Sequence, residues 1–233
     1  MSTIPDLDTS NIHRVLVVVA HPDDAEYGLS AAVSLWTDTN ITVDYLLLTK
    51  GEAGIRHLPP EKCAPIRRQE QQAACDTVGV QDLTMLNFPD GQLVYSLELR
   101  KAIAKHIRQR KPDTVIIANF DVEAYGSYNQ ADHRVAGLAT IDAVRDADNP
   151  WLFTDLGLAT HKATRMLVAN SAEPTHRQTV DEAHVAKGIK SLACHKVYFE
   201  ALPDHPAAEE FIPMMLQQDD GAKAVLFRVF DPV

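Results

Sequence analysis

The sequence has few features of a disulfide-stabilised, nucleic-acid-binding or membrane-spanning protein. Its three cysteines are far apart and odd in number, so they indicate neither a disulfide framework nor a cysteine zinc finger. Basic residues are outnumbered by acidic ones, 22 to 32, and the net charge of −10 argues against a binding surface for phosphate backbones. Residues 1–13 lack the pattern of a secretory signal, and the apolar run 15–20 is too short to span a bilayer. We therefore expect a cytoplasmic protein with no membrane span and no nucleic-acid partner.

Apolar, β-branched runs alternate with segments of helical periodicity along most of the chain. The expected strands cover residues 14–20, 41–49, 83–88, 113–119 and 163–170, with a late apolar stretch at 224–230. The expected helices cover residues 24–36, Pro65 to about Val78, 96–110, 132 to about 145, and 181–195. This alternation predicts an α/β fold whose mostly parallel sheet is covered by helices on both faces. We expect one domain over residues 1–233, with a core at about 14–195 and a C-terminal elaboration at about 196–233 that adds a strand or a cover.

Polar loops follow the first four expected strands, at the sheet edge where open parallel sheets bind ligands. Neither the glycine-rich loops of nucleotide-binding proteins nor the G-x-S-x-G turn of serine hydrolases is present. The first strand ends instead in His21-Pro22-Asp23-Asp24. His21 and Asp24 can converge while Asp23 points elsewhere, and His133 could supply a third ligand, which completes a typical catalytic zinc set. The alternative is that Asp24 caps the following helix and His21 is an ordinary loop histidine.

Several short motifs resemble those of one enzyme family. The string AHPDDAE at 20–26 resembles the signature of the PIG-L/LmbE-like N-deacetylases. Further similarities follow in the family's order, at TKGEAG (49–54), Arg67 with Glu70, FPDG (88–91) and ADH (131–133). The resemblance implies a Rossmann-like sheet and a hydrolase of linear amide bonds that removes acetyl groups from N-acetylglucosamine conjugates.

The same resemblance implies how the cluster is used. It places Zn²⁺ on His21, Asp24 and His133, with Asp23 as the general base that moves protons. This division is chemically reasonable, because zinc makes water more acidic while a neighbouring carboxylate accepts the released proton. A site with two histidines and one aspartate also accepts Fe²⁺ or Co²⁺.

The chain departs from the family pattern at two places. Gln130 stands where the family commonly has a histidine, and a glutamine can donate an N–H to an oxyanion but cannot carry a proton. We therefore expect acid–base catalysis to rest on Asp23, with Gln130 helping to hold the oxyanion. The family's H-x-S-Q becomes His195-Lys196-Val197-Tyr198, so His195 either reaches the substrate or is a buried structural residue.

Other residues near the expected site are candidates for binding a substrate. Arg56 could hold a hydroxyl or phosphate, or be an ordinary loop arginine. Asp90 belongs first to a turn and could in addition contact a sugar, and Tyr128 lies in a loop that could cover one. Asp132 could orient a neighbour, but we favour a role as helix cap.

The sequence thus predicts a zinc-dependent N-deacetylase that acts on a small amino-sugar conjugate. Two alternatives remain: a zinc amidohydrolase for another N-acylated small molecule or natural product, and a sugar-binding module that has lost its activity. Because substrate choice depends on variable loops, the sequence does not identify the aglycone or the acyl chain. It also leaves open whether the chain forms a homo-oligomer.

Overall fold

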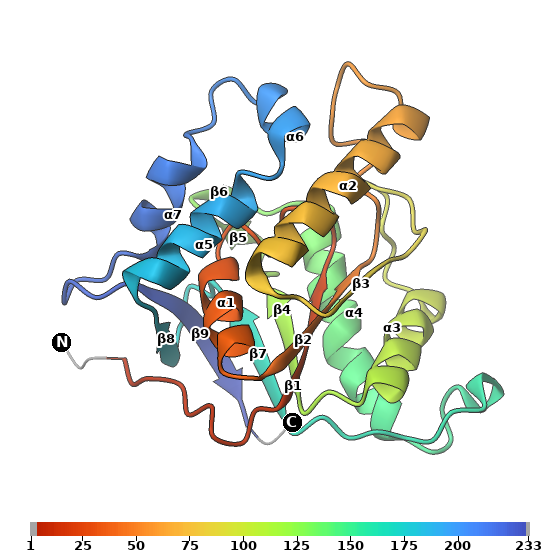
Figure 1. The fold of residues 1–233 in the computed structure, drawn as a ribbon. Helices are drawn as coiled ribbons and strands as arrows, with labels where there is room; N and C mark the ends of the chain where they lie inside the picture. Colours follow the sequence, from red (N-terminus) through yellow and green to blue (C-terminus); the bar gives the residue numbers. More distant parts are fainter. Residues whose placement is uncertain (1–3, 232–233) are drawn as a thin grey trace.

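The computed structural model describes residues 4–231 and contains a seven-stranded sheet between two layers of helices (Figure 1). The strand order is β3-β2-β1-β4-β7-β9-β8. These strands are β1 (Arg14–Val19), β2 (Thr42–Leu47), β3 (Asp82–Met85), β4 (Thr114–Ala118), β7 (Arg165–Ala169), β8 (His176–Thr179) and β9 (Ala224–Phe230). The first five are parallel, whereas β9 is antiparallel to both β7 and β8. The expected mostly parallel α/β sheet is confirmed.

Each face of the sheet packs against its own set of helices (Figure 1). The helices are α1 (Ser30–Asp38), α2 (Pro60–Val78), α3 (Leu97–Arg110), α4 (Ala131–Asp148), α5 (Glu182–Leu192), α6 (Lys196–Glu200) and α7 (Ala208–Leu216). In β1, Val15 and Val17 point into a core shared with α1, α2, α5 and α7, while Leu16 and Val18 pack against α3 and α4. Because both faces of β1 are buried, its sequence is a continuous apolar run rather than an alternating one.

Two helices begin at other residues than the sequence suggested. Helix α1 begins at Ser30 instead of residue 24, because the preceding residues form turns around the site: Asp23 has a φ of 83° and its carbonyl accepts the N–H of Glu26. Helix α2 begins at Pro60, five residues before Pro65, which lies inside it. Proline suits the first helical position, because the N–H that it lacks would have no partner there. In α2 this position is occupied by Pro60 and not by Pro65. Helix α3 begins as expected, and it is capped by Ser96, whose hydroxyl accepts the N–H of Leu99 at 3.2 Å.

Some elements were not expected. The loop after β4 folds into a small hairpin, β5 (Glu123–Ala124) with β6 (Ser127–Tyr128), and a 3₁₀ turn covers Thr154–Leu156. Strand β8 has the sequence HRQT, which lacks the apolar alternation by which half-buried strands are recognised. The late stretch 224–230 is a strand that lies between β7 and β8. Among residues 4–231, no helix is long and apolar enough to cross a membrane.

Candidate metal centre and active site

The residues of the expected metal site meet at the point in the sheet where the order of successive strands reverses. From β1 the chain continues to β2 and β3 on one side, and later to β4 and β7 on the other. His21 and Asp24 follow β1 directly, and His133 lies in the first turn of α4, after the loop that leaves β4. Ligands of open α/β sheets bind at this kind of switch point, beyond the carboxyl ends of the strands.

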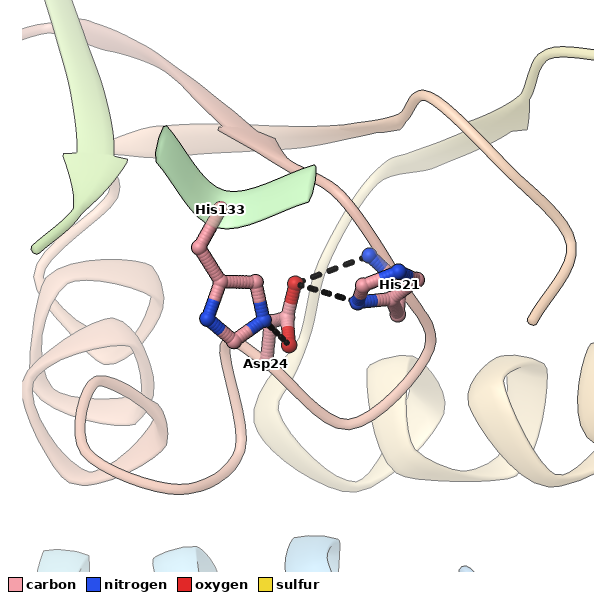
Figure 2. Close-up of side chains that lie close together, drawn as sticks. All are labelled: His21, Asp24 and His133. Atoms are coloured by element: carbon pink, nitrogen blue, oxygen red, sulfur yellow. Dashed lines mark hydrogen bonds and ion pairs between the residues drawn. The ribbon is translucent and has the colours of Figure 1, made fainter. Parts of the chain in front are cut away.

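Asp24 lies between the two histidines (Figure 2). Its Oδ1 is 3.0 Å from Nε2 of His133, and its Oδ2 is 3.6 Å from Nδ1 of His21. One ligand atom from each of the three residues lies within 4.8 Å of the others, so the cluster could hold a metal ion. Burial opposes ionisation of Asp24, but the two histidines hold the pKa of its carboxyl well below the usual range. Burial also lowers the pKa of His133, and Asp24 more than offsets this, with a net rise.

The remaining ring nitrogen of each histidine already has a partner. Nε2 of His21 is 3.0 Å from Oδ1 of Asp90 and 3.2 Å from Oδ2 of Asp132, and Nδ1 of His133 is 2.9 Å from Oδ1 of Asn129. A partner on one ring nitrogen fixes the tautomer and leaves the other nitrogen free to bind a cation. The donor set therefore fits a metal ion, because it supplies two oriented imidazoles and a carboxylate.

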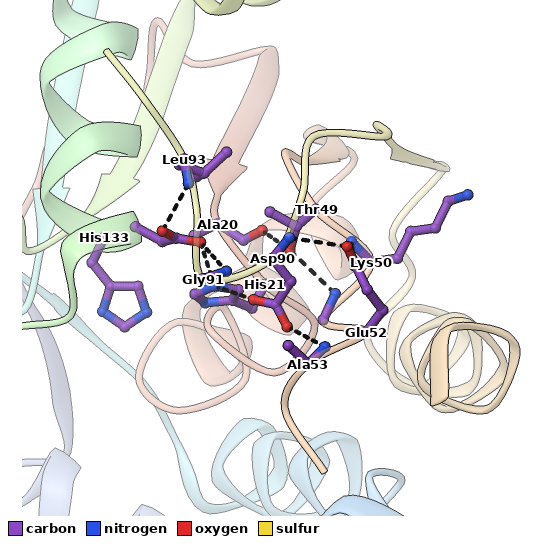
Figure 3. A network of polar contacts seen from close by, with 12 residues as sticks. Ala20, His21, Thr49, Lys50, Glu52, Ala53, Asp90, Gly91, Leu93 and His133 are labelled. Carbon is purple, nitrogen blue, oxygen red and sulfur yellow. Dashed lines mark hydrogen bonds and ion pairs between the residues drawn. The ribbon is translucent and has the colours of Figure 1, made fainter. Parts of the chain in front are cut away.

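Asp132 orients its surroundings and does not cap α4. Its carboxylate accepts the backbone N–H groups of Gly91 at 2.8 Å and Leu93 at 3.1 Å, in addition to its contact with His21. Figure 3 shows His21, Asp90, Gly91 and Leu93 gathered in this network. The prediction that Asp132 caps the helix is thus wrong, because its oxygens are taken by the turn after β3. A His-Asp-Asp group of His21, Asp90 and Asp132 is also close enough for a cation, but backbone N–H groups already bind both carboxylates.

Asp23 is buried and is not one of the three residues that could hold a metal ion. It is 3% exposed, and its Oδ1 lies 3.2 Å from the guanidinium of Arg67, while its backbone N–H donates to Gln71 at 2.9 Å. Burial raises the pKa of Asp23 to about 6, against the opposing effect of Arg67. Its Oδ2 has no hydrogen-bond partner within residues 4–231. A buried carboxylate with a raised pKa and one free oxygen is suited to accept and return a proton.

Arg67 joins three segments around Asp23. Its guanidinium donates to the carbonyl of Pro22 at 2.6 Å and to that of Gly51 at 3.2 Å, and the ring of Tyr198 covers it at 4.0 Å. Nearby, Glu70 accepts the backbone N–H of Val197 at 2.6 Å. Arg67 and Glu70, the R-x-x-E pair of the sequence, therefore connect α2 to the loop after β1, to the loop after β2 and to α6.

The other expected site residues lie at different depths. Gln130 is exposed at the start of α4, Arg56 is exposed in the loop after β2, and the side chain of Tyr128 projects from β6 with 83% of its surface exposed. His195 is fully buried, with Nε2 at 3.5 Å from Oε2 of Glu26. With no exposed surface it cannot touch a substrate in this conformation, which favours the structural alternative for His195. Glu26 is buried as well, and its other carboxylate oxygen accepts a hydrogen bond from Gln71 at 3.0 Å.

Sequence reasoning did not identify Asn129 and Gln71 as supporting residues. Asn129, which lies just before α4, contacts the ring of His133 four residues later, and Gln71 accepts the backbone N–H of Asp23. The spacing of Asn129 and His133, four residues apart, was the one available signal. Gln71 lies in α2, far from Asp23 in the sequence, and no pattern in the sequence indicates that the two residues are in contact.

Taken together, the sheet and the cluster define an α/β protein with a two-histidine, one-aspartate site that could hold a metal ion. The chain belongs to the GlcNAc-PI de-N-acetylase (PIG-L) family, whose model matches residues 16–144.

Relatives with recorded names agree with this assignment. A diacetylchitobiose deacetylase of Thermococcus kodakarensis is 34% identical over 143 residues, which cover 60% of this chain and 52% of that protein. The match thus spans about half of that relative's length. A probable N-acetyl-alpha-D-glucosaminyl L-malate deacetylase 2 of Bacillus anthracis is 28% identical over 200 residues, covering 81% of this chain and 83% of that one.

A solved structure has the same fold. It is that of N,N′-diacetylchitobiose deacetylase from Pyrococcus horikoshii in complex with an inhibitor, with a TM-score of 0.84 and 23% identity. The alignment covers 97% of this chain and 87% of the other. At this identity the likeness supports the fold alone.

Proposed function

We propose that this protein is a zinc-dependent hydrolase that removes the N-acetyl group from an N-acetylglucosamine-type conjugate. The proposal rests most on one juxtaposition: His21, Asp24 and His133 converge next to Asp23, a buried carboxylate that is not among the ligands. The names of the family and of the relatives supply the substrate class, an N-acetylated amino sugar.

In this proposal His21, Asp24 and His133 hold zinc. When bound there, zinc supplies Lewis-acid chemistry, since it makes water more acidic and polarises an amide carbonyl. Asp132 and Asn129 keep the ligand nitrogens turned toward the ion by occupying the opposite ring nitrogens.

Asp23 moves the proton. Arg67 contacts Oδ1 of Asp23, and Oδ2, which has no hydrogen-bond partner among residues 4–231, is the oxygen that receives the proton of the attacking water. Asp23 takes the proton from this water and returns it to the nitrogen of the departing amine, so that the acetyl group leaves as acetate. Gln130, three residues before His133, donates a side-chain N–H to the oxyanion without taking part in proton transfer.

The experiment compares metal content and acetate release in the wild type, His21→Ala and Asp23→Asn. We expect stoichiometric zinc in the wild type, its loss in His21→Ala, and retained zinc with a kcat lower by roughly 10²–10⁴-fold in Asp23→Asn. Asp148→Asn, an exposed position at the far end of α4, is the control and should match the wild type. Full activity of Asp23→Asn would refute the assignment of the base.

Substrate panels separate the proposal from its alternatives. Turnover of simple acylamides without any N-acetylated sugar would favour a different amidohydrolase. Sugar binding with no hydrolysis, in protein that carries its zinc, would favour an inactive sugar-binding module. The intact set of three ligands and a base weighs against that second alternative.

A further inference from the structure

The hairpin β5–β6 is fastened to the candidate site at its base. Asn129, the residue after β6, donates from Nδ2 to the carbonyls of Asn119 at 2.9 Å and Asp121 at 3.0 Å. The same side chain holds Nδ1 of His133 through Oδ1. One buried residue therefore closes the base of the hairpin and orients a metal ligand, so the hairpin has a fixed position relative to the reacting centre.

The tip of the hairpin contains a tyrosine in an unfavourable backbone conformation. Tyr125 has a φ of 56° and Gly126 a φ of 77°, the pattern of a type I′ turn. Asparagine, aspartate and glycine suit the first of these positions, whereas a bulky side chain is strained in the left-handed region. Strained residues of this kind cluster at active sites and ligand-binding segments.

The hairpin borders an open hollow of about 720 Å³, whose other wall includes Ala172 beyond β7. Tyr125 and Tyr128 both line it, and both are more than half exposed. Exposed aromatic side chains beside a concavity are typical of a binding surface rather than of a core. Among the lining residues that the structure describes, the only charged one is Glu123.

We propose that this hollow is the subsite for the part of the substrate beyond the acetylated sugar, and that it takes a neutral sugar ring. The inference rests on the proposed deacetylase function and narrows its substrate class. The apolar C–H face of a second hexose can stack on a tyrosine ring, and its hydroxyls tolerate a nearby carboxylate. An anionic aglycone such as a malate would meet Glu123 with no opposing cation among the lining residues, and like charges in contact disfavour binding.

This lining distinguishes between the substrates that the names of two relatives contain. Diacetylchitobiose carries a neutral second sugar, whereas the N-acetylglucosaminyl malate carries an anionic group at the same place. The lining of the hollow therefore favours a substrate of the diacetylchitobiose type over an N-acetylglucosaminyl malate.

The kinetic test measures kcat/KM for N,N′-diacetylchitobiose, N-acetylglucosamine and N-acetylglucosaminyl malate. We expect the wild type to prefer the disaccharide over the malate by about tenfold or more. Tyr128→Ala should lower kcat/KM for the disaccharide by about three- to tenfold, with a smaller loss for the monosaccharide. Glu123→Lys should narrow the gap between disaccharide and malate.

Stability separates a binding role of Tyr125 from a structural one. Tyr125→Asn should raise the Tm, because asparagine suits the turn, while it lowers kcat/KM for the disaccharide. A tyrosine kept for structure would give the opposite, a lower Tm. Trp151→Ala is the matched control, an aromatic residue as exposed as Tyr128, at 85%, beyond the other end of α4.

Failure of the subsite and failure of the proposed function give different results. Calorimetry with Asp23→Asn measures disaccharide binding even if no substrate is turned over. Hydrolysis with equal kcat/KM for the disaccharide and the malate overturns the subsite only. Disaccharide binding to Asp23→Asn that Tyr128→Ala leaves unchanged overturns it as well, with or without catalysis.

Discussion

Asp23 and Asp24 are neighbours in sequence but have opposite surroundings, and the backbone between them produces the difference. The φ of 83° at Asp23 turns its side chain toward Arg67, while Asp24 faces His21 and His133. Burial raises the pKa of Asp23 to about 6, whereas the two histidines outweigh burial at Asp24 and hold its pKa low. Adjacent carboxylates whose pKa values move apart are typical of acid–base sites, where one carboxylate binds charge and the other transfers protons.

Asp132 permits a prediction about the metal rather than the reaction. Asp132→Asn removes one of the two negative charges that contact Nε2 of His21, the other being that of Asp90, so Nδ1 becomes a weaker and less well oriented ligand. We expect zinc affinity, measured by competition with a chromogenic chelator, to fall by about 10–100-fold.

The control for Asp132→Asn is again Asp148→Asn, which should keep the wild-type affinity. Asp132 also anchors Gly91 and Leu93, so the metal-free Tm must be measured alongside. A lower Tm with unchanged zinc affinity would mean that Asp132 supports the turn only.

At the scale of elements, Arg67 makes the loops after β1 and β2 depend on α2. The loop after β2 can approach Arg67 closely because it carries glycine there: a Cβ on Gly51 would contact the guanidinium and lie 2.8 Å from Cδ of Pro22. Gly51 also has a φ of 62°. Its lack of a side chain is therefore required twice, for conformation and for space.

Gly51→Ala should therefore lower the free energy of unfolding by more than backbone strain alone would. Gly157→Ala is the matched control, because Gly157 has a φ of 63° and no described atom lies within 4 Å of its would-be Cβ. We expect both variants to lose about 1 kcal/mol in the free energy of unfolding, and Gly51→Ala to lose roughly 1–3 kcal/mol more. In urea titrations, equal losses would show that the contact with Arg67 relaxes without cost. Gly51→Ala should also lower kcat, since Arg67 orients Asp23.

The elements that could be predicted from sequence are those with a strong periodic signal. Strand β1 is a buried apolar run, and helix α3 has both an apolar face and a serine cap. Strand β8 is short and polar, and it exists because β9 pairs with it, a contact between distant parts of the chain. The start of α1 was misplaced because the residues before Ser30 are helix-compatible but turn around Asp24.

At the scale of the whole molecule, the predicted ligands come together because β1 and β4 are neighbours in the sheet. The short spacing between His21 and Asp24 predicts that these two residues converge. His133 is brought to them by the order of the strands, which no local sequence pattern contains. The supporting residues Gln71 and Asn129 depend on the exact packing of α2 and α4 against those loops. This is why the cluster of His21, Asp24 and His133 could be expected from the sequence, whereas most of the residues that contact it could not.

The global stability of the fold should also depend on one histidine far from the site. Burial, with help from Arg110 and Lys105, lowers the pKa of His106 to about 4, while Asp82 of β3 opposes this weakly. An unfolded histidine titrates near 6.5, so between pH 6.5 and 4 the unfolded state binds a proton that the folded state does not. The contribution of His106 to stability must then fall as the pH drops through this window, by up to about 1.4 kcal/mol per pH unit, and be constant above it.

Replacing His106 with a side chain that does not titrate isolates this contribution from the carboxylates that change over the same range. The free energy of unfolding of the wild type and of His106→Gln is measured in urea at several pH values from 4 to 8. The difference between the two proteins should be constant above pH 7 and shift in favour of the variant as the pH falls toward 4, because only the wild type loses stability through residue 106. A difference that stays constant over the whole range would mean that His106 takes up its proton as readily in the folded state, and that its environment is more hydrated than its packing on α3 indicates.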